Sequence, residues 1–247
     1  MSTSKTHWLQ RSKILLGQAA IENLQHSHVL LAGAGGVGGY AAEALARSGL
    51  GALTVFDPDK VHITNLNRQI LALHSTLDEY KTGVLRQRLL DINPDIRVNA
   101  CAEALTANNI EKILQDNCFD YIVDAIDSVN DKCCLLATAH RMQIPVISAM
   151  GAGRRLDPTA LQYADISKTY NCKLAKVVRS KLKKEYDIVK GIECVFSSEP
   201  SLPPADNSTP EDNSIIGSCS WLPGISGLYL AARVIQVLGK KNCCKTV

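Results

Sequence analysis

Short, mainly apolar runs alternate along residues 28–148 with longer segments that mix apolar and polar positions. Runs of this length are typical of strands that are buried on both faces of a parallel sheet. They cover His28–Gly33, Ala52–Phe56, Ile96–Ala100, Tyr121–Asp124 and Ile144–Ser148. Segments with helical patterning lie between them, at 40–48, 81–92, 107–115 and 129–142. Strands that alternate with helices predict a Rossmann-like, doubly wound α/β sheet with right-handed crossovers.

The second part of the chain has a different composition. Arg154–Lys190 contains ten Lys or Arg against four Asp or Glu, a local charge of +6 in a chain whose net charge is +3. Glu199–Ser214 has four prolines among small and acidic residues, which predicts a mobile loop. Gly224–Leu238 predicts an apolar helix that returns to the core, and Gly239–Val247 predicts a frayed tail.

Composition narrows the class of protein. With 247 residues, 46% of them hydrophobic and 21% charged, the chain can bury a sizeable core. Its nine cysteines form no C-x-x-C pair, and the odd number fits a secreted disulfide framework poorly. No segment has the apolar run of a signal peptide or the ~18 apolar residues of a membrane span. We expect a soluble cytoplasmic protein; the 15-residue segment Gly224–Leu238 favours a packing helix and leaves membrane association open.

A glycine motif links the first predicted strand to the first predicted helix. Gly33, Gly35 and Gly38 form G-x-G-x-x-G, which permits a tight turn and lets backbone N–H groups approach a phosphate. Asp57 ends the next strand, 19 residues after Gly38, where a carboxylate accepts hydrogen bonds from ribose hydroxyls. This pattern alone is the fingerprint of a dinucleotide site, or of a glycine turn that serves only packing.

Polar residues farther along favour a triphosphate over NAD. Asn67, Arg68 and Lys81 follow the ribose-binding strand closely, with Arg68 suited to clamp phosphate and Lys81 to act as a point charge. Asp127 follows the strand Tyr121–Asp124 at the carboxyl edge of the sheet, where a carboxylate can hold Mg²⁺ between phosphates. The alternative for Asp127 is an N-cap of the following helix.

Together these residues resemble the ThiF/MoeB/HesA superfamily, the bacterial relatives of ubiquitin-activating enzymes, which adenylate carboxylates with Mg·ATP. The resemblance extends over nearly the whole chain. It implies an adenylation fold like that of ubiquitin-activating enzymes, a homodimer, ATP and Mg²⁺ as cofactors, and a metal contact from Asp127. It implies catalytic roles for Arg68, Lys81 and Asp127. The nucleotide-binding residues that it implies are Arg11 (reaching the partner subunit's ATP), Gly33, Gly35, Gly36, Gly38, Asp57, Asn67, Arg68, Lys81 and Asp127.

The target carboxylate separates two branches of the superfamily. Enzymes that adenylate the C-terminus of a ubiquitin-like sulfur carrier usually hold zinc with two C-x-x-C pairs, and this sequence has none. Asp124–Asn130, Asp157–Thr159, Asp165–Thr169 and Cys194–Glu199 resemble instead the branch that dehydrates threonylcarbamoyladenosine in tRNA. That resemblance implies adenylation of the threonyl carboxylate, followed by ring closure. Carrier activation is the alternative, and an NAD(P) oxidoreductase is a distant third.

The expected partners follow from the same resemblance. Arg154–Lys190 would supply cations for tRNA phosphates, whereas its helical spacing alone favours a solvated helix face. The sequence leaves open whether a cysteine desulfurase or sulfur acceptor is a partner. For Cys219, a small packing residue is favoured over a catalytic one. We expect one domain, 1–247, with an ATP-binding half at 1–150 and a basic, loop-rich half at 151–247 that faces the tRNA.

Overall fold

Seven strands form one sheet in the computed structural model, which describes residues 7–203 and 215–240. Their order is β3-β2-β1-β4-β5-β7-β6, and all pairs are parallel except that between β7 and β6. The strands are β1 (His28–Ala32), β2 (Ala52–Phe56), β3 (Arg97–Cys101), β4 (Tyr121–Asp124), β5 (Val146–Ala149), β6 (Leu161–Asp165) and β7 (Glu193–Ser197). The predicted doubly wound α/β sheet is therefore confirmed.

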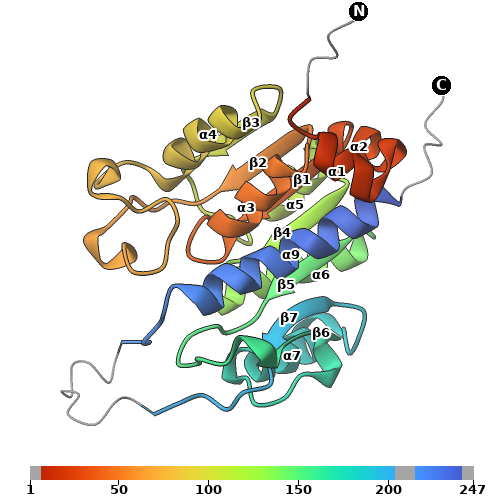
Figure 1. Ribbon diagram of the computed structural model, residues 1–247. Coiled ribbons are helices and arrows are strands. Elements are labelled where there is room, and N and C mark those ends of the chain that lie inside the picture. The colour runs from red at the N-terminus through yellow and green to blue at the C-terminus, as the bar shows by residue number, and fades with distance from the viewer. Residues whose placement is uncertain (1–6, 204–214, 241–247) are drawn as a thin grey trace, which may run out of the picture.

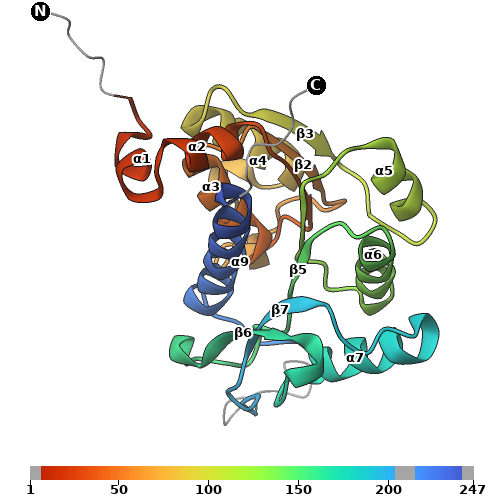
Figure 2. The same ribbon diagram turned by 90° about the vertical axis from the view of Figure 1, so that its right-hand side faces the viewer.

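Helices cover both faces of the sheet. Figures 1 and 2 show α3 and α9 on one face and α5, α6 and α7 on the other. The helices are α1 (Gln10–Leu16), α2 (Gln18–Gln25), α3 (Gly38–Arg47), α4 (Lys81–Ile92), α5 (Ile110–Asp116), α6 (Val129–Arg141), α7 (Lys173–Tyr186) and α9 (Trp221–Gly239). Four short 3-10 turns join them: η1 (Ile63–Asn65), η2 (His74–Thr76), η3 (Pro158–Ala160) and η4 (Ile166–Lys168).

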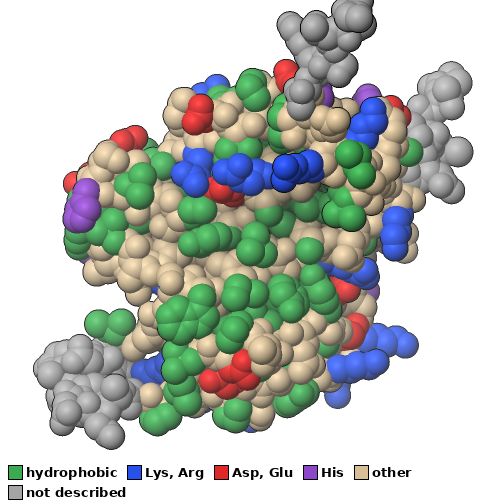
Figure 3. Space-filling view, viewed as in Figure 1, with side chains coloured by type: hydrophobic (Ala, Val, Ile, Leu, Met, Phe, Trp, Pro, Cys, Tyr) green, Lys and Arg blue, Asp and Glu red, His purple; other side chains and the backbone are tan. Residues whose placement is uncertain are grey.

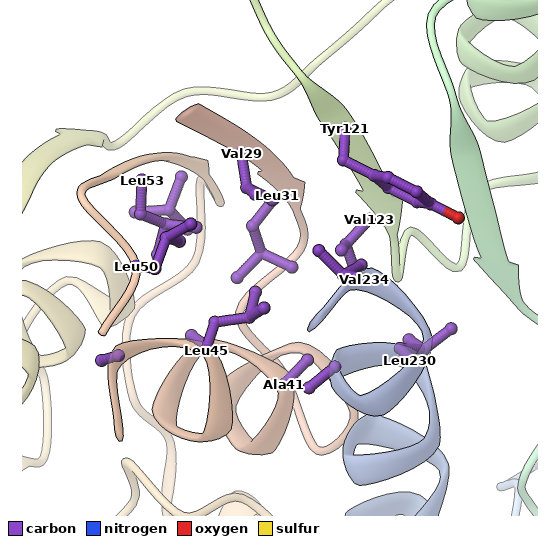
Figure 4. Packing of buried hydrophobic residues seen from close by; sticks show 14 of the residues in the cluster. Val29, Leu31, Ala41, Leu45, Leu50, Leu53, Tyr121, Val123, Leu230 and Val234 are labelled. Atoms are coloured by element: carbon purple, nitrogen blue, oxygen red, sulfur yellow. The ribbon is translucent and has the colours of Figure 1, made fainter. Parts of the chain in front are cut away.

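Strand β1 is apolar throughout because it lies inside the sheet and is covered on both faces. Val29 and Leu31 pack into the cluster that faces α3 and α9, which includes Leu45 and Val234 (Figure 4). Leu30 and Ala32 point to the opposite side, into a second cluster built with α5, α6 and α7. A strand that is covered on both faces needs an apolar side chain at every position, so the uninterrupted run is the expected signature.

The C-terminal half holds more regular structure than predicted. Strands β6 and β7 were not predicted, and they extend the same sheet that carries the glycine motif. Helix α9 begins at Trp221 rather than Gly224, because Pro223 lies in the first turn, where a missing N–H costs no hydrogen bond. Residues 204–214 of the predicted mobile loop and 241–247 of the predicted tail lie outside the described residues.

Helix α9 is long and apolar enough to pass a length-and-composition test for a membrane span. Core helices pass the same test, and half of its most apolar stretch is buried. Leu230, Val234 and Leu238 are fully buried in the cluster shared with α3. The expected packing role of this segment is what the fold shows.

Candidate active site

A cleft of about 500 Å³ opens at the carboxyl ends of β1, β2 and β4. The sheet order reverses between β1 and β4, and open α/β sheets bind ligands at such a switch point. The volume suits a ligand of nucleotide size. The N-terminal half supplies most of the walls, and 152–153, 216, 218 and 223 close the cleft from the C-terminal half.

Glycine is required at the positions of the motif for different physical reasons. Gly33 has φ +92°, and a Cβ there would lie 2.7 Å from the carbonyl oxygen of Ala125. A Cβ on Gly38 would lie only 1.8 Å from the Gly33 carbonyl oxygen. At Gly35, which lines the cleft, the nearest atom to an added Cβ would be the Gln69 Nε2 at 3.8 Å. Gly33 and Gly38 are thus needed by the turn, whereas Gly35 leaves open space for a ligand.

Asp57 ties the glycine loop to the end of β2. One carboxylate oxygen, Oδ2, accepts the Ala34 N–H at 2.7 Å, and Oδ1 accepts the Asp59 N–H at 2.9 Å. Burial raises the pKa of Asp57, against the opposing effects of Lys81 and of these two amides. The carboxylate lines the cleft, as a ribose-binding residue must.

Lys81 begins α4 and brings its ammonium group to the same wall. Its side chain is only 6% exposed, with Nζ at 2.7 Å from Asp59 Oδ2 and 4.0 Å from Asp57 Oδ1. Sequence reasoning missed Asp59, although its place two residues after Asp57 was a usable signal. The pair keeps a cation at the cleft before any phosphate arrives.

Arg68 and Asn67 lie at the rim, on the loop that follows β2. The Arg68 guanidinium lines the cleft and donates to the Thr64 carbonyl at 2.9 Å and to Asn67 Oδ1 at 3.0 Å. Asn67 is exposed, does not line the cleft, and donates to the Ser218 carbonyl at 3.1 Å. Asn67 therefore joins the Arg68 loop to the C-terminal segment that closes the cleft.

Two buried amides on the same loop were not predicted. Asn65 and Gln69 both line the cleft and are 8% and 7% exposed. The Gln69 Oε1 is buried and has no hydrogen-bond partner in the part of the chain that the structure describes. Buried acceptors are rarely left without a donor, so this oxygen offers an anchoring point to a ligand.

Asp127 lies exposed on the β4–α6 connection and lines the cleft. The N-cap of α6 is Ser128, so the alternative reading of Asp127 as that cap is wrong. Asp131 also lines the cleft, and its Oδ2 accepts the Ser128 hydroxyl at 2.7 Å. No group of three or more His, Cys, Asp or Glu within the described residues is placed to hold a metal. One or two carboxylates suit Mg²⁺ that is shared with phosphates, so the donor set fits that ion.

Three predicted site residues are absent from the lining of the cleft: Asn67, Gly38, which the turn itself requires, and Arg11. Arg11 lies exposed on α1, which buries none of its residues.

The basic segment divides into exposed and structural cations. Lys173, Lys176, Lys183 and Lys184 are exposed on α7. Arg155, in contrast, is 4% exposed and donates to the backbone carbonyls of residues 151, 171 and 199. Arg155 is therefore a buried structural residue and does not belong to a phosphate-binding surface.

The doubly wound sheet, the glycine loop and the nucleotide-sized cleft at the switch point define an α/β protein of the adenylating class, with Asp57, Arg68 and Lys81 in the lining of the cleft. The chain belongs to the ThiF family, whose sequence profile matches residues 9–247. It is 39% identical to the tRNA threonylcarbamoyladenosine dehydratase of Bacillus subtilis over 244 residues, 95% of each chain. It is also 39% identical to the Escherichia coli enzyme of that name over 211 residues, 82% of this chain and 78% of that protein.

Solved structures agree with these sequence relatives. The E. coli dehydratase TcdA in complex with ATP superposes with a TM-score of 0.88 at 33% identity, covering 96% of both chains. Its complex with AMP gives 0.86 at the same identity, covering 96% of this chain and 97% of that one. The sulfur carrier protein ThiS adenylyltransferase of E. coli is 35% identical, but over only 57% of each protein.

Proposed function

We propose that this protein is an ATP-dependent dehydratase that cyclises threonylcarbamoyladenosine in tRNA. The observation that carries the proposal is a nucleotide-sized cleft whose glycine loop, Asp57, Arg68, Lys81 and Asp127 converge on one site. Relatives that cover nearly the whole chain bear this enzyme's name. Structures of the E. coli relative hold ATP and AMP; ATP is the substrate of an adenylation, and AMP is what the adenylate releases in the step that follows.

The proposed chemistry has two steps. A threonyl carboxylate oxygen attacks the α-phosphorus of ATP, and pyrophosphate leaves. A carbamoyl nitrogen or oxygen then attacks the activated acyl carbon, a proton is lost, and AMP leaves with the former carboxylate oxygen. Neither step needs a protein nucleophile, so catalysis rests on positioning and on neutralising phosphate charge.

Each cleft residue has a role in that chemistry. The N–H groups around Gly35 and Gly36 receive phosphate oxygens, and Asp57 accepts the ribose hydroxyls. Arg68 and Lys81 neutralise the triphosphate, Lys81 by exchanging part of its contact with Asp59 for phosphate. Asp127, with Asp131 beside it, would hold Mg²⁺ against the phosphates, and that ion would withdraw charge from the leaving pyrophosphate.

We also propose a homodimer in which Arg11 completes the partner's site. Helix α1 leaves Ile14 78% and Leu15 83% exposed, which is unusual for large aliphatic side chains of a monomer. Figure 3 shows further hydrophobic side chains spread over the face that α9 occupies in Figure 1. Leu228 of α9, 47% exposed, belongs to this exposed apolar surface.

The tRNA would contact the exposed lysines of α7. Neutralised phosphates release counterions, so binding should weaken steeply with salt. We expect replacement of Lys173 and Lys176 by Gln to lower the slope of log affinity against log salt by about one for each lysine. Arg155 is excluded from this surface because its guanidinium is buried. Equal slopes for variant and wild type would remove α7 from the proposed tRNA surface.

The direct test of function incubates the purified protein with Mg·ATP and tRNA that carries threonylcarbamoyladenosine. Nucleosides from the digested tRNA are then weighed by mass spectrometry. We expect an ATP-dependent loss of about 18 mass units, one water, that Lys81→Ala and Asp127→Ala abolish. No loss of mass, with pyrophosphate exchange only when a Gly-Gly-ended carrier protein is added, would establish the carrier-activating alternative instead.

Three further expectations stay proposals. We propose that residues 1–247 act as one domain, since strands from both halves share one sheet and both halves line the cleft. A cytoplasmic location accords with a tRNA substrate. A cysteine desulfurase or sulfur acceptor is a candidate partner on the family resemblance alone. Cys219 is half-buried beside the carbonyl of Arg155 and lies outside the lining of the cleft.

A further inference from the structure

A fully buried ion pair supports the β4–α6 connection from behind the cleft. Lys132 in the first turns of α6 and Asp124 at the end of β4 are both 0% exposed, and Lys132 Nζ lies 2.7 Å from Asp124 Oδ2. The hydroxyl of Ser148 on β5 donates to the same carboxylate oxygen at 2.6 Å. The chemistry proposed above makes no use of this lysine.

The ion pair holds the backbone that leads to Asp127. The Ile126 N–H donates to Asp124 Oδ1 at 3.1 Å, and the Ile126 carbonyl accepts from Lys132 Nζ at 2.9 Å. That carbonyl belongs to the peptide that joins Ile126 to Asp127, and both residues line the cleft. Lys132 therefore sets the orientation of the peptide from which the Asp127 side chain leaves the loop.

The same connection packs against the glycine loop. The Ala125 N–H donates to the Ala32 carbonyl at 2.8 Å, where β1 ends. The Ala125 carbonyl is so close to Gly33 that a Cβ on the glycine would lie 2.7 Å away. A rotated Ile126–Asp127 peptide would thus disturb both phosphate-facing loops, not one.

A gain in stability does not by itself explain why a lysine occupies this buried position. A cation near the N-terminus of a helix opposes the helix dipole, and two buried ions lose their hydration. Buried ion pairs can often be exchanged for uncharged groups of similar volume without loss of stability. The hydrogen bond from Lys132 Nζ to the Ile126 carbonyl points instead to a role in holding the loop.

We propose that Lys132 is a positioning residue for the adenylation step, which acts by holding the Ile126–Asp127 peptide so that Asp127 faces the metal-bound triphosphate. The proposal rests on the ATP site proposed above but is independent of which carboxylate is adenylated. If the wild-type protein fails to bind Mg·ATP, the proposed function fails, whereas a difference in Mg·ATP binding between wild type and a Lys132 variant bears on Lys132 alone.

A charge-neutral double variant separates positioning from charge balance. Lys132→Met alone leaves Asp124 as a stranded buried charge, so it should lose stability and activity whatever the role of Lys132. Lys132→Met combined with Asp124→Asn strands no charge, but it leaves the Ile126 carbonyl without its donor. We expect the thermal midpoint of this double variant to return close to that of the wild type. Its affinity for Mg·ATP and its turnover number should both fall tenfold or more, which is the usual effect of removing residues that support a site from behind.

A thermodynamic cycle with Asp127 supplies a readout that is independent of turnover. Asp127→Ala should weaken Mg·ATP binding in the wild-type background, measured by calorimetry. In the Lys132→Met/Asp124→Asn background the same change should cost less than about twofold, because Lys132 acts through Asp127. Ser148→Ala is the matched control, since it removes a bond to Asp124 without touching Ile126, and it should keep the wild-type affinity.

Two results would overturn the proposal. One is a folded double variant that binds and turns over Mg·ATP like wild type, which would reduce Lys132 to the counter-ion of Asp124. The other is an Asp127→Ala effect of equal size in both backgrounds. If the methionine variant does not fold, Lys132→Gln with Asp124→Asn keeps a donor for the Ile126 carbonyl; it should retain affinity, and a loss like that of Asp127→Ala would refute the role.

Discussion

Replacing single glycines of the glycine loop by alanine distinguishes glycines that the fold needs from glycines that ligand binding needs. Position 35 has room for a Cβ, and its backbone conformation is one that alanine adopts. The same Cβ stands in the space where a phosphate would approach the backbone N–H groups. We therefore expect Gly35→Ala to keep the thermal midpoint of wild type but to weaken ATP binding tenfold or more, about 1.4 kcal/mol.

Gly38→Ala is the contrasting variant. Its Cβ would collide with the Gly33 carbonyl oxygen at 1.8 Å, so the turn itself must distort. Thermal unfolding together with calorimetric titration of ATP distinguishes the two positions. An unchanged ATP affinity in a folded Gly35→Ala protein would contradict the placement of phosphate over this loop.

At the residue scale, spacing along the sequence indicated which side chains lie at the cleft, while their roles toward a nucleotide stay predictions. Asp57 and Lys81 were expected near the nucleotide, and both line the cleft. Asp59 was missed although it lies two residues after Asp57, because the ammonium that pairs with it is 22 residues away. Gln69 was assigned no role because a polar residue in a loop does not by itself reveal its partner. Lys132 was missed because a lysine in a helix ordinarily indicates a solvated face, and only the tertiary fold shows it buried.

The half-buried His28, the first residue of β1, makes stability depend on pH. His28 Nε2 lies 2.9 Å from Thr54 Oγ1, and the ring packs against Phe119 with centroids 4.7 Å apart. Burial, and then the charge of Arg97, hold the pKa of His28 below its usual value, although Asp120 opposes them. The unfolded chain thus binds a proton more readily than the folded one, and stability is lost as the pH falls through about 6.5.

We expect the free energy of unfolding to fall on acidification from about pH 7.5 to about pH 5.5, and to fall less in His28→Gln, which keeps a polar group for Thr54. Urea denaturation at both pH values measures the difference. His74→Gln, at an exposed position, is the control and should behave as wild type. Equal losses in wild type and His28→Gln would exclude His28 as the titrating group.

Among the elements, the apolar pattern predicted strands β1 to β5 but not β7 and β6, which form one edge of the sheet. The bounds of β2, β4 and α4 agree with the prediction because each run is bordered by a polar residue or a glycine. Strand β6 lies at the edge of the sheet, and its buried and exposed side chains do not alternate regularly. Its sequence therefore lacks the pattern of a strand and resembles a loop. Strand β7 is buried, but the surrounding polar and proline-rich sequence hides it. Edge strands depend on their neighbours more than on their own residues.

At the scale of the whole molecule, the dimer proposal predicts complementation between inactive subunits. Arg11→Ala removes a residue proposed to act in the partner's site, whereas Lys81→Ala removes one from its own site. A mixed dimer then has one intact site, so the mixture should recover about a quarter of wild-type activity, because half of randomly formed dimers are mixed. Each variant alone should be inactive in the dehydration assay.

The control pairs Lys81→Ala with Asp127→Ala, which both act within their own chain. No mixed dimer of these two variants has an intact site, so their mixture should stay inactive. Recovery in the control, or none with Arg11→Ala, would contradict an arginine acting between subunits. Sedimentation of Leu15→Asp, expected to be monomeric, tests whether α1 forms the contact itself, and Val189→Asp, at an exposed apolar position beyond α7, should sediment as wild type.

An oxygen label shows whether this cleft adenylates the threonyl carboxylate. The tRNA substrate is prepared with ¹⁸O in both carboxylate oxygens and incubated with Mg·ATP, and the AMP released is analysed by mass spectrometry. We expect one ¹⁸O atom in AMP for each threonylcarbamoyladenosine that is cyclised, and none in pyrophosphate. Unlabelled AMP, or label in inorganic phosphate, would show that the carboxylate is not activated as an adenylate.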